Sequence, residues 1–384
     1  MTSKFLSNIC FSLLLLSLGT SSLYSDDSNS TKKVEFLDKE DGMLDMSDYM
    51  SQAYGFIAVP VIITEPSVGY GGGATLVYLH DSLTGKKTKA GRRVPPSVSG
   101  IILAATENGT KVGGGFHMGY WMEDYIRTTT YIGYPDVVIN IYQNDKAIEM
   151  NLNGIFAYQN IKFRIGESDF FLGASYMYTD PEVSFAFDVI DKKFERESTV
   201  SSAGIILEYD SRDNKLSPNQ GMLVTAKALF YDESIGSDYE FQRYKVTGSF
   251  YNKLTETINL DFNFMYEQEI GDYIPPYLLP FVSMRGIPLM RYQGRDLLTL
   301  QVQSSYKFTS RWSGLVFGGI ARVYGETTLQ EGTSFSDANN IYAGGVGFRY
   351  LLAKKFGLRV GVDIATSKAD NAFYIQFGSA WRGF

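Results

Sequence analysis

The sequence is poor in the residues that build metal centres, disulfides and membrane-spanning helices. Among 384 residues there is one cysteine, Cys10, and there are two histidines, His80 and His117. A single cysteine cannot form an internal disulfide, and two histidines leave little material for a histidine-rich metal centre. After residue 25 no apolar run approaches the roughly 20 residues that a transmembrane helix needs. We therefore expect no metal and no cofactor.

Catalytic motifs and an excess of positive charge are also missing. The sequence contains no Gly-x-Ser-x-Gly element, and neither histidine has the neighbours of a catalytic triad. We expect that the protein is not an enzyme, and that His117, on a predicted strand, faces the interior of the fold. Since 35 Lys and Arg stand against 42 Asp and Glu, the net charge of −7 gives no electrostatic attraction to nucleic acid.

The first 25 residues have the layout of a secretory signal peptide. Lys4 supplies a positive charge, residues 9–18 (ICFSLLLLSL) form an apolar run, and small residues follow from Gly19. This run is too short to span a bilayer as a helix. We expect cleavage between Ser21 and Ser25, with a retained membrane anchor as the alternative. Residues 26–55, polar and acidic at first, are expected to form a short periplasmic tail.

Most of the remaining chain alternates between apolar and polar residues. In residues 257–267 (TINLDFNFMYE), Leu260 and Phe262 fall on one face and Asp261 and Asn263 on the other. This period of two indicates strands with one apolar and one polar surface. The predicted strands lie near residues 67–80, 97–106, 110–121, 125–141, 146–159, 167–178, 182–190, 199–209, 221–231, 240–253, 256–269, 295–308, 312–324, 340–351, 356–366 and 372–382.

The length and aromatic content of these strands favour a membrane over water as their surroundings. Aromatic residues make up 15% of the chain, and a strand that crosses a bilayer needs about 9–11 residues, with aromatics at both interfaces. Lipid cannot satisfy the backbone groups of an open sheet edge, so the sheet has to close. We therefore predict an all-β fold, a transmembrane antiparallel β-barrel of about 16 strands over residues 56–384. Its place would be the bacterial outer membrane, reached after export, with outer-membrane lipid around it.

Three segments resemble the BamA/TamA family of outer-membrane proteins, also called the bacterial surface antigen family. Residues 202–230 resemble its strand–turn–strand signature, residues 280–298 its loop with an Arg-Gly pair, and residues 373–381 (FYIQFGSAW) its closing strand. The resemblance implies that the outer-membrane assembly machinery reads the end of the chain and inserts the barrel. The matching residues are Asp210, Arg212, Asp213, Pro218 and Gly221 in the turn, Arg285, Gly286 and Arg291 in the loop, and Phe377, Gly378, Trp381 and Phe384 at the end.

The N-terminal part resembles members that consist of a barrel alone. Residues 65–79 (EPSVGYGGGATLVYL) are similar to the first strand of such barrels, and the segment from 26 to 52 is too short for one POTRA domain. Glycine weakens strand interiors. We therefore expect a weak seam, meaning the junction between the first and last strands, whose first strand carries Gly69, Gly71, Gly72 and Gly73.

The resemblance also implies a role for the Arg-Gly loop. In the family the loop arginine folds into the lumen and pairs with acidic groups, but here Gln301 and Gln303 stand where an acid is usual. Asp363, on the lumen side of a later predicted strand, is the candidate partner of Arg285 or Arg291. The alternative is that Arg285 lies on a solvated turn.

Two functions remain open from the sequence. In the first, the weak seam helps an unidentified client protein or lipid to insert into the outer membrane or to cross it. In the second, the barrel is a passive pore or a structural surface protein, with a lumen lined by polar residues. The candidate lining residues are Arg243, Lys245, Asp261 and Asn263.

Overall fold

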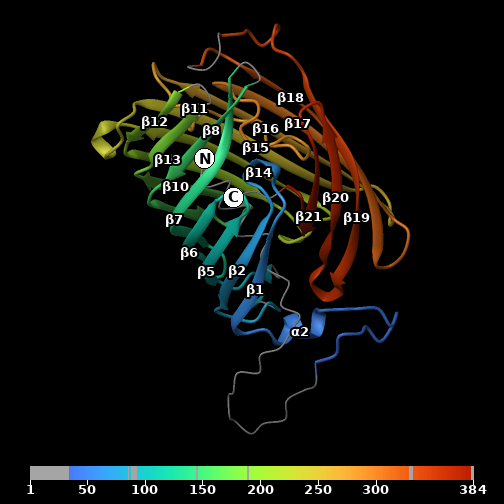
Figure 1. Cartoon of the computed structure of the whole chain (residues 1–384). Helices are drawn as coiled ribbons and strands as arrows, with labels where there is room; N and C mark the ends of the chain where they lie inside the picture. Colours follow the sequence, from blue (N-terminus) through green and yellow to red (C-terminus); the bar gives the residue numbers. More distant parts are fainter. Residues whose placement is uncertain are drawn as a thin grey trace.

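The computed structural model is an antiparallel barrel of 16 strands that is nearly closed (Figure 1). It describes residues 34–84, 86–87, 93–143, 146–187, 190–327 and 332–381, so the predicted signal peptide and Phe384 lie outside the described residues. The strands of the wall are β1 (Gly55–Ile63), β2 (Gly71–Leu79), β5 (Val98–Thr106), β6 (Lys111–Trp121), β7 (Ile126–Gln143), β9 (Phe156–Arg164), β10 (Phe170–Thr179), β13 (Val200–Asp210), β14 (Gly221–Tyr231), β15 (Phe241–Lys253), β16 (Ile258–Ile270), β17 (Asp296–Lys307), β18 (Trp312–Tyr324), β19 (Ile341–Ala353), β20 (Leu358–Ser367) and β21 (Asn371–Phe377).

Three further strands extend the sheet beyond the barrel. The first half of β7 pairs with β9 in the wall, whereas its second half pairs with β8 (Lys146–Asn153). β8 then pairs with β11 (Glu182–Phe187), and β11 pairs with β12 (Ile190–Glu197). In Figure 1 this extension rises at the end of the barrel farthest from α2 (Ser47–Gln52).

The predicted number of strands agrees with the structure, but two of the assignments were wrong. The predicted strand at 182–190 belongs to the extension and not to the wall, and the strand at 146–159 is broken at Gly154 into β8 and β9. β1 falls within the predicted barrel region, except for Gly55, but it was not among the predicted strands. Its sequence, GFIAVPVII, is apolar on both faces and so lacks the alternation that marked the others.

In every strand of the wall, alternate residues point into the lumen, and the registers align these residues across neighbouring strands. In the C-terminal half this side is polar, as predicted: Lys245 lies beside Glu267, and Asn263 lies beside Gln301. In the N-terminal half it is apolar. Val77, Ile102, Val112 and Phe116 are buried on the lumen side of β2, β5 and β6, while Leu76, Ile101 and Leu103 are exposed on the outside.

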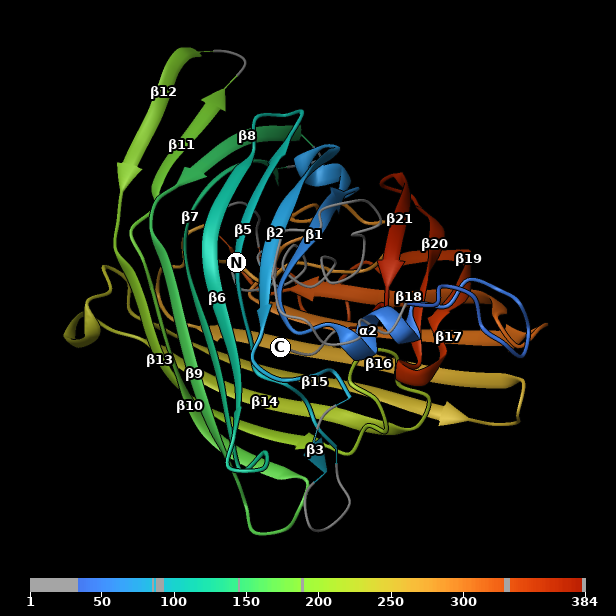
Figure 2. The ribbon, with the colours of Figure 1, turned by 90° about the horizontal axis from the view of Figure 1, so that it is seen from below.

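Short elements and turns complete the two ends of the barrel. α2 and the segment before it lie across the end where β1 begins (Figure 2), and we call this the α2 end. In the part of the chain that the structure describes, no helix is both long and apolar enough to cross a membrane. The short elements are β3 (Lys86–Lys87), β4 (Arg93–Val94), η1 (Pro66–Val68), η2 (Glu233–Ile235) and η3 (Lys354–Phe356).

Candidate functional site: the seam of the barrel

The first and last strands of the barrel are not hydrogen-bonded to each other. Among the described strands, β1 forms a ladder with β2 and β21 forms one with β20, and no ladder joins β1 to β21. Figure 2 shows the two strands facing each other as the two ends of the sheet. Each of them therefore presents a free row of backbone N–H and C=O groups, which is a template for pairing with another strand.

The glycine-rich strand is next to the seam and not at its edge, so that part of the prediction was wrong. β2, with Gly71, Gly72 and Gly73, is paired with β1 on one side and with β5 on the other. Gly69 lies before the strand, where it ends η1 with a φ of +76°. The edge strand is β1, and it contains Pro60, a residue that sheets tolerate in edge strands because it cannot donate a hydrogen bond.

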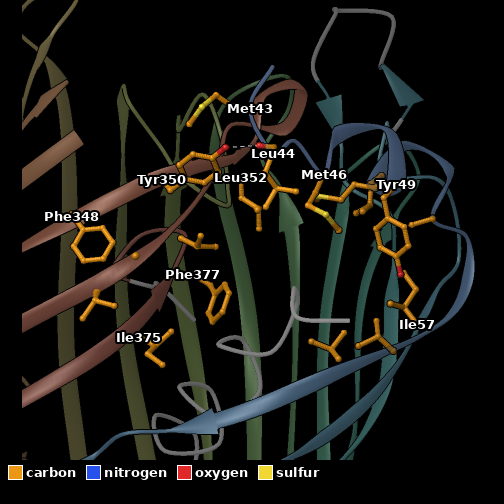
Figure 3. Close-up of a pocket in the computed structure, with 18 of the residues that line it drawn as sticks. Met43, Leu44, Met46, Tyr49, Ile57, Phe348, Tyr350, Leu352, Ile375 and Phe377 are labelled. Atoms are coloured by element: carbon orange, nitrogen blue, oxygen red, sulfur yellow. Dashed lines mark hydrogen bonds between the residues drawn. The ribbon is translucent and has the colours of Figure 1, made fainter. Parts of the chain in front are cut away.

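An apolar pocket of about 600 Å³ lies at the seam near the α2 end (Figure 3). Its two walls come from opposite faces of the sheet. One wall is the lumen side of β1 and β2, with Ile57 and Val77, which are register partners. The other is the outer side of β18 to β21, with Val360 and Ile375 among its residues. The first strands of the sheet therefore overlap the outer surface of the last ones here, instead of meeting them edge to edge.

The segment before β1 covers this pocket at the α2 end. Met46 and Met50 are buried against Leu352 of β19 and Phe356 of η3. The backbone continues the contact, because the Met46 N–H donates to the Leu352 carbonyl at 2.8 Å and the Tyr350 hydroxyl donates to the carbonyl of Leu44 at 2.6 Å. In Figure 3, Met46, Tyr49 and Ile57 lie across the pocket from Phe348, Ile375 and Phe377.

Arg311 binds this segment to the turn between β17 and β18. Its buried guanidinium donates to Asp38, Asp41 and Asp45, each at 2.6 Å. Lys354 adds ion pairs to Asp38 at 3.4 Å and to Glu40. We call Arg311 and its three aspartates the Arg311 cluster. It lies outside the membrane-spanning strands and fixes the cover of the pocket to the barrel by charge.

The protonation of two of these aspartates is shifted by their partners. The hydrogen bond from Arg311, together with one from the Met43 N–H, holds the pKa of Asp41 below its ordinary value. Burial alone would raise the pKa of Asp45, but hydrogen bonds from Ser47 and Arg311 outweigh it and the pKa is lowered. Both carboxylates therefore stay charged at neutral pH, which is the state that Arg311 binds.

The structure brings together Arg285 and Asp363, the residues expected to pair inside the lumen. Arg285 lies in the long loop between β16 and β17, and its Nη1 donates to Asp363 Oδ2 at 2.5 Å. Its Nη2 donates to Gln303 at 2.9 Å, and its guanidinium lies 3.5 Å from the centre of the Phe317 ring. Arg349 also binds Asp363, at 2.6 and 2.8 Å. Arg285 is thus buried in a charged cluster, and the solvated turn does not occur.

The neighbours of Arg285 in the loop have different surroundings. The Gly286 N–H donates to the Tyr374 hydroxyl at 3.0 Å, and its carbonyl accepts from Ser367 at 2.6 Å. Gly286 has a φ of +91°, a conformation that favours glycine. Arg291 is not the partner of Asp363 but lies over the ring of Tyr142, 4.4 Å from its centre. The loop is therefore fixed to β20 and β21, the strands on one side of the seam.

The same loop fills part of the lumen with apolar side chains. Six buried loop residues belong to one cluster with the lumen-side residues of β1, β2 and β5 to β7. The Tyr277 hydroxyl is hydrogen-bonded to Ser198 at 2.9 Å. The apolar interior of the N-terminal strands thus packs against this loop inside the barrel. The six residues are Ile274, Tyr277, Leu278, Leu279, Leu289 and Met290.

The turn motif after β13 forms a hydrogen-bonded structure at the α2 end. Asp210 accepts from Arg212 at 2.8 Å and from Arg127 of β7 at 2.9 Å. Asp213 accepts from the backbone N–H groups of residues 219 and 220. The buried Pro218 precedes these two residues, and the half-buried Gly221 follows them. Gly221 has a φ of +95°, and a Cβ there would lie 2.3 Å from the Ser211 carbonyl oxygen.

The described residues after β21, 378–381, turn into the barrel and do not continue the last strand. β21 ends at Phe377, whose ring lines the seam pocket, so the strand predicted over 372–382 is shorter than expected. The Gly378 N–H donates to the Arg359 carbonyl at 2.7 Å. Trp381 is buried inside, where its carbonyl accepts from Tyr251 of β15 at 3.0 Å.

The two histidines meet on the outer surface, so the prediction that His117 faces the interior was wrong. Ser99 Oγ lies 2.8 Å from His80 Nε2 and 2.8 Å from His117 Nδ1. His117 points outward because its neighbours Phe116 and Met118 take the lumen side, which is apolar here. Within the described ranges no three His, Cys, Asp or Glu side chains are grouped so that they could hold a metal ion.

The fold is similar to those of solved outer-membrane barrels. BamA from Haemophilus ducreyi lacking POTRA domains 1–3 superposes with a TM-score of 0.56 at 11% identity, over 85% of this chain and 70% of that one. CdiB from Escherichia coli gives 0.54 at 10% identity, over 83% and 61%, and CdiB from Acinetobacter baumannii gives 0.53 at 9%, over 84% and 59%. No protein-family model and no curated protein matches the sequence.

These comparisons define the class of fold. The chain is an outer-membrane β-barrel with the architecture of the BamA and CdiB barrels. It spans about three-fifths of the length of each CdiB chain, and at about one residue in ten the identity shows the fold alone.

Proposed function

We propose that the protein resides in the bacterial outer membrane after signal-dependent export and that it helps a client protein or lipid to insert into that membrane or to cross it through the seam. The observation that carries this proposal is the missing ladder between β1 and β21. In lipid, each unsatisfied backbone group costs several kcal/mol. A strand from another chain that pairs with β1 would remove this cost.

The packing inside the barrel favours passage of a client through the seam over passage along the barrel axis. A passive pore needs a path along the barrel axis, whereas the loop between β16 and β17 packs inside the barrel and is held by Arg285. Two of the four residues expected to line a pore are held in ion pairs with neighbouring strands: Arg243 with Glu269, and Lys245 with Glu267 at 2.7 Å. We propose no chemical reaction for the barrel.

Crosslinking in living cells tests the proposal. A photoreactive amino acid in place of Phe56 or Ala58, on the outer side of β1, is expected to capture an unfolded outer-membrane protein during its assembly. Ile205 on β13 is the matched control, because it is also exposed on the outer side but its strand is paired on both edges. We expect capture from β1 and none from Ile205.

Recordings of current across a planar bilayer, together with the crosslinking, distinguish a lateral role from a passive pore. Equal capture at β1 and β13, or no capture together with a steady open-channel current, would contradict a lateral role and support the passive pore. A structural surface protein would give neither capture nor current. The machinery that inserts the barrel itself is expected to contact the seam only during biogenesis, so crosslinking is started after synthesis of the barrel has been stopped.

A further inference from the structure

We propose that the seam pocket is a binding site for one acyl chain of a membrane phospholipid, which enters from the surrounding bilayer. This goes beyond the proposed function, because an acyl chain can occupy the pocket whether or not a client uses the seam.

The chemistry of the lining selects a hydrocarbon. None of the described residues that line the pocket is charged; the lining consists of aliphatic side chains, methionines and aromatic rings, with Gly361. Water in such a space would find few hydrogen-bond partners, whereas a hydrocarbon chain loses nothing by entering it. The volume, about 600 Å³, falls within the range of about 300–1,000 Å³ that is usual for small-ligand pockets.

The pocket adjoins the lipid-facing surface of the barrel, so lipid acyl chains are available beside it. Val360, Val362 and Ile375 belong to the outer side of β20 and β21, the side that carries the exposed apolar residues Ile364 and Phe373 and faces lipid. The pocket is thus continuous with the membrane-facing surface. An acyl chain on this surface lies next to residues that line the pocket, and Val59 and Val77 form the opposite wall.

The segment that covers the pocket can adapt to an acyl chain, which is long and changes its conformation. Met43, Met46 and Met50 all line it from the N-terminal segment, and methionine adapts its shape to irregular spaces. At the rim, the exposed Lys355 donates from Nζ to Ser51 of α2 at 2.9 Å. A cation at this place suits the phosphate of the lipid while the chain lies inside.

Photolabelling with a lipid distinguishes this pocket from ordinary contact with the bilayer. The full chain is reconstituted in vesicles of phosphatidylethanolamine that carries a diazirine near the end of one acyl chain, and labelled residues are mapped by mass spectrometry. Bulk lipid reaches Phe56 and Leu76 on the outer side. Val59 and Val77 face the other way and are buried, so they are labelled only from inside the pocket.

Two matched substitutions provide the control. Val360→Trp fills the pocket from β20, and Val346→Trp places the same side chain on the outer face of β19 outside the pocket. We expect labelling of Val59 and Val77 in the parent chain and in V346W, and at least a fivefold loss in V360W with Leu76 labelled as before. Folding of each variant is checked by the heat-dependent mobility of the barrel in gels. Met50→Trp, which fills the pocket from α2, replaces V360W if that variant does not fold.

Several results would overturn the proposal. Labels confined to Phe56 and Leu76, or an equal loss in V346W, would show that no acyl chain occupies the pocket. Labelling by a free fatty acid with the same diazirine, but not by the phospholipid, would refute the phospholipid as its source. If the acyl label is found but β1 captures no client, the proposed function fails and the acyl-chain site stands.

Discussion

Removal of Asp363 is expected to destabilise the barrel more than removal of Arg285, although the two residues form one ion pair. Asp363 is fully buried and binds two cations, Arg285 at 2.5 Å and Arg349 at 2.6 and 2.8 Å. Arg285→Ala leaves Asp363 with Arg349, so the loss is two charge-assisted hydrogen bonds, to Asp363 and to Gln303, each worth about 1.5–3 kcal/mol. Asp363→Ala leaves two buried guanidinium groups without their shared carboxylate. Breaking one buried pair already costs about 3–5 kcal/mol.

The free energy of unfolding in urea, measured in lipid vesicles, checks this order. Arg322→Ala is the control, because Arg322 on β18 is bonded to Asn340 and to the Phe335 carbonyl in an exposed place, and we expect its loss to cost below about 1 kcal/mol. The double variant of Arg285 and Asp363 should show a coupling energy of at least about 1 kcal/mol. If D363A costs no more than R285A, or if both match R322A, the reasoning on the buried cluster is refuted.

Two other predictions concern the loop and the cover of the pocket. Gly286→Val forces a branched side chain to a φ of +91°, with its Cβ 3.2 Å from that of Ala365; we expect at least about 1–2 kcal/mol lost and faster protease cleavage of the loop, and unchanged cleavage would contradict this. Because Asp41 and Asp45 have a lowered pKa, their contribution is present above the ordinary pKa of about 4 and is lost as the pH falls below it. Protease should therefore release the N-terminal segment at pH 3 but not at pH 6. Arg311→Gln should release it at both, and a segment that stays protected in R311Q would refute the role of the Arg311 cluster.

Much of the barrel wall could be predicted because its two sides meet different surroundings. From β14 onward the outer side faces lipid and the lumen side carries paired charges, so alternation in the sequence reports the strand directly. Asp363 could also be found from the sequence. It is the acidic residue on the polar face of the predicted strand over 356–366, in a region where the usual acids are replaced by Gln301 and Gln303.

The seam could not be predicted because it breaks that rule. β1 has lipid on one side and the pocket on the other, so both of its faces are apolar and its strand pattern disappears. His117 was placed on the wrong side for a related reason, since the loop between β16 and β17 makes the lumen apolar beside β6. The pocket itself joins residues from Met43 to Phe377, and no local pattern reports a contact between the two ends of a chain.

Different interactions oppose movement of the loop inside the barrel and separation of β1 from β21 at the seam. To open the axis, the loop must give up the buried Arg285–Asp363 pair and the apolar cluster of six side chains, and each of these costs several kcal/mol. To open the side, no ladder between β1 and β21 has to break, because none joins these described strands. What holds the side is the Arg311 cluster, the hydrogen bonds and ion pairs that join the segment before β1 to β19 and η3, and apolar contact, which lipid replaces as the strands separate. Among the described strands of the wall, the junction of β1 and β21 is the one that no ladder closes, and it is there that a client strand or an acyl chain would enter.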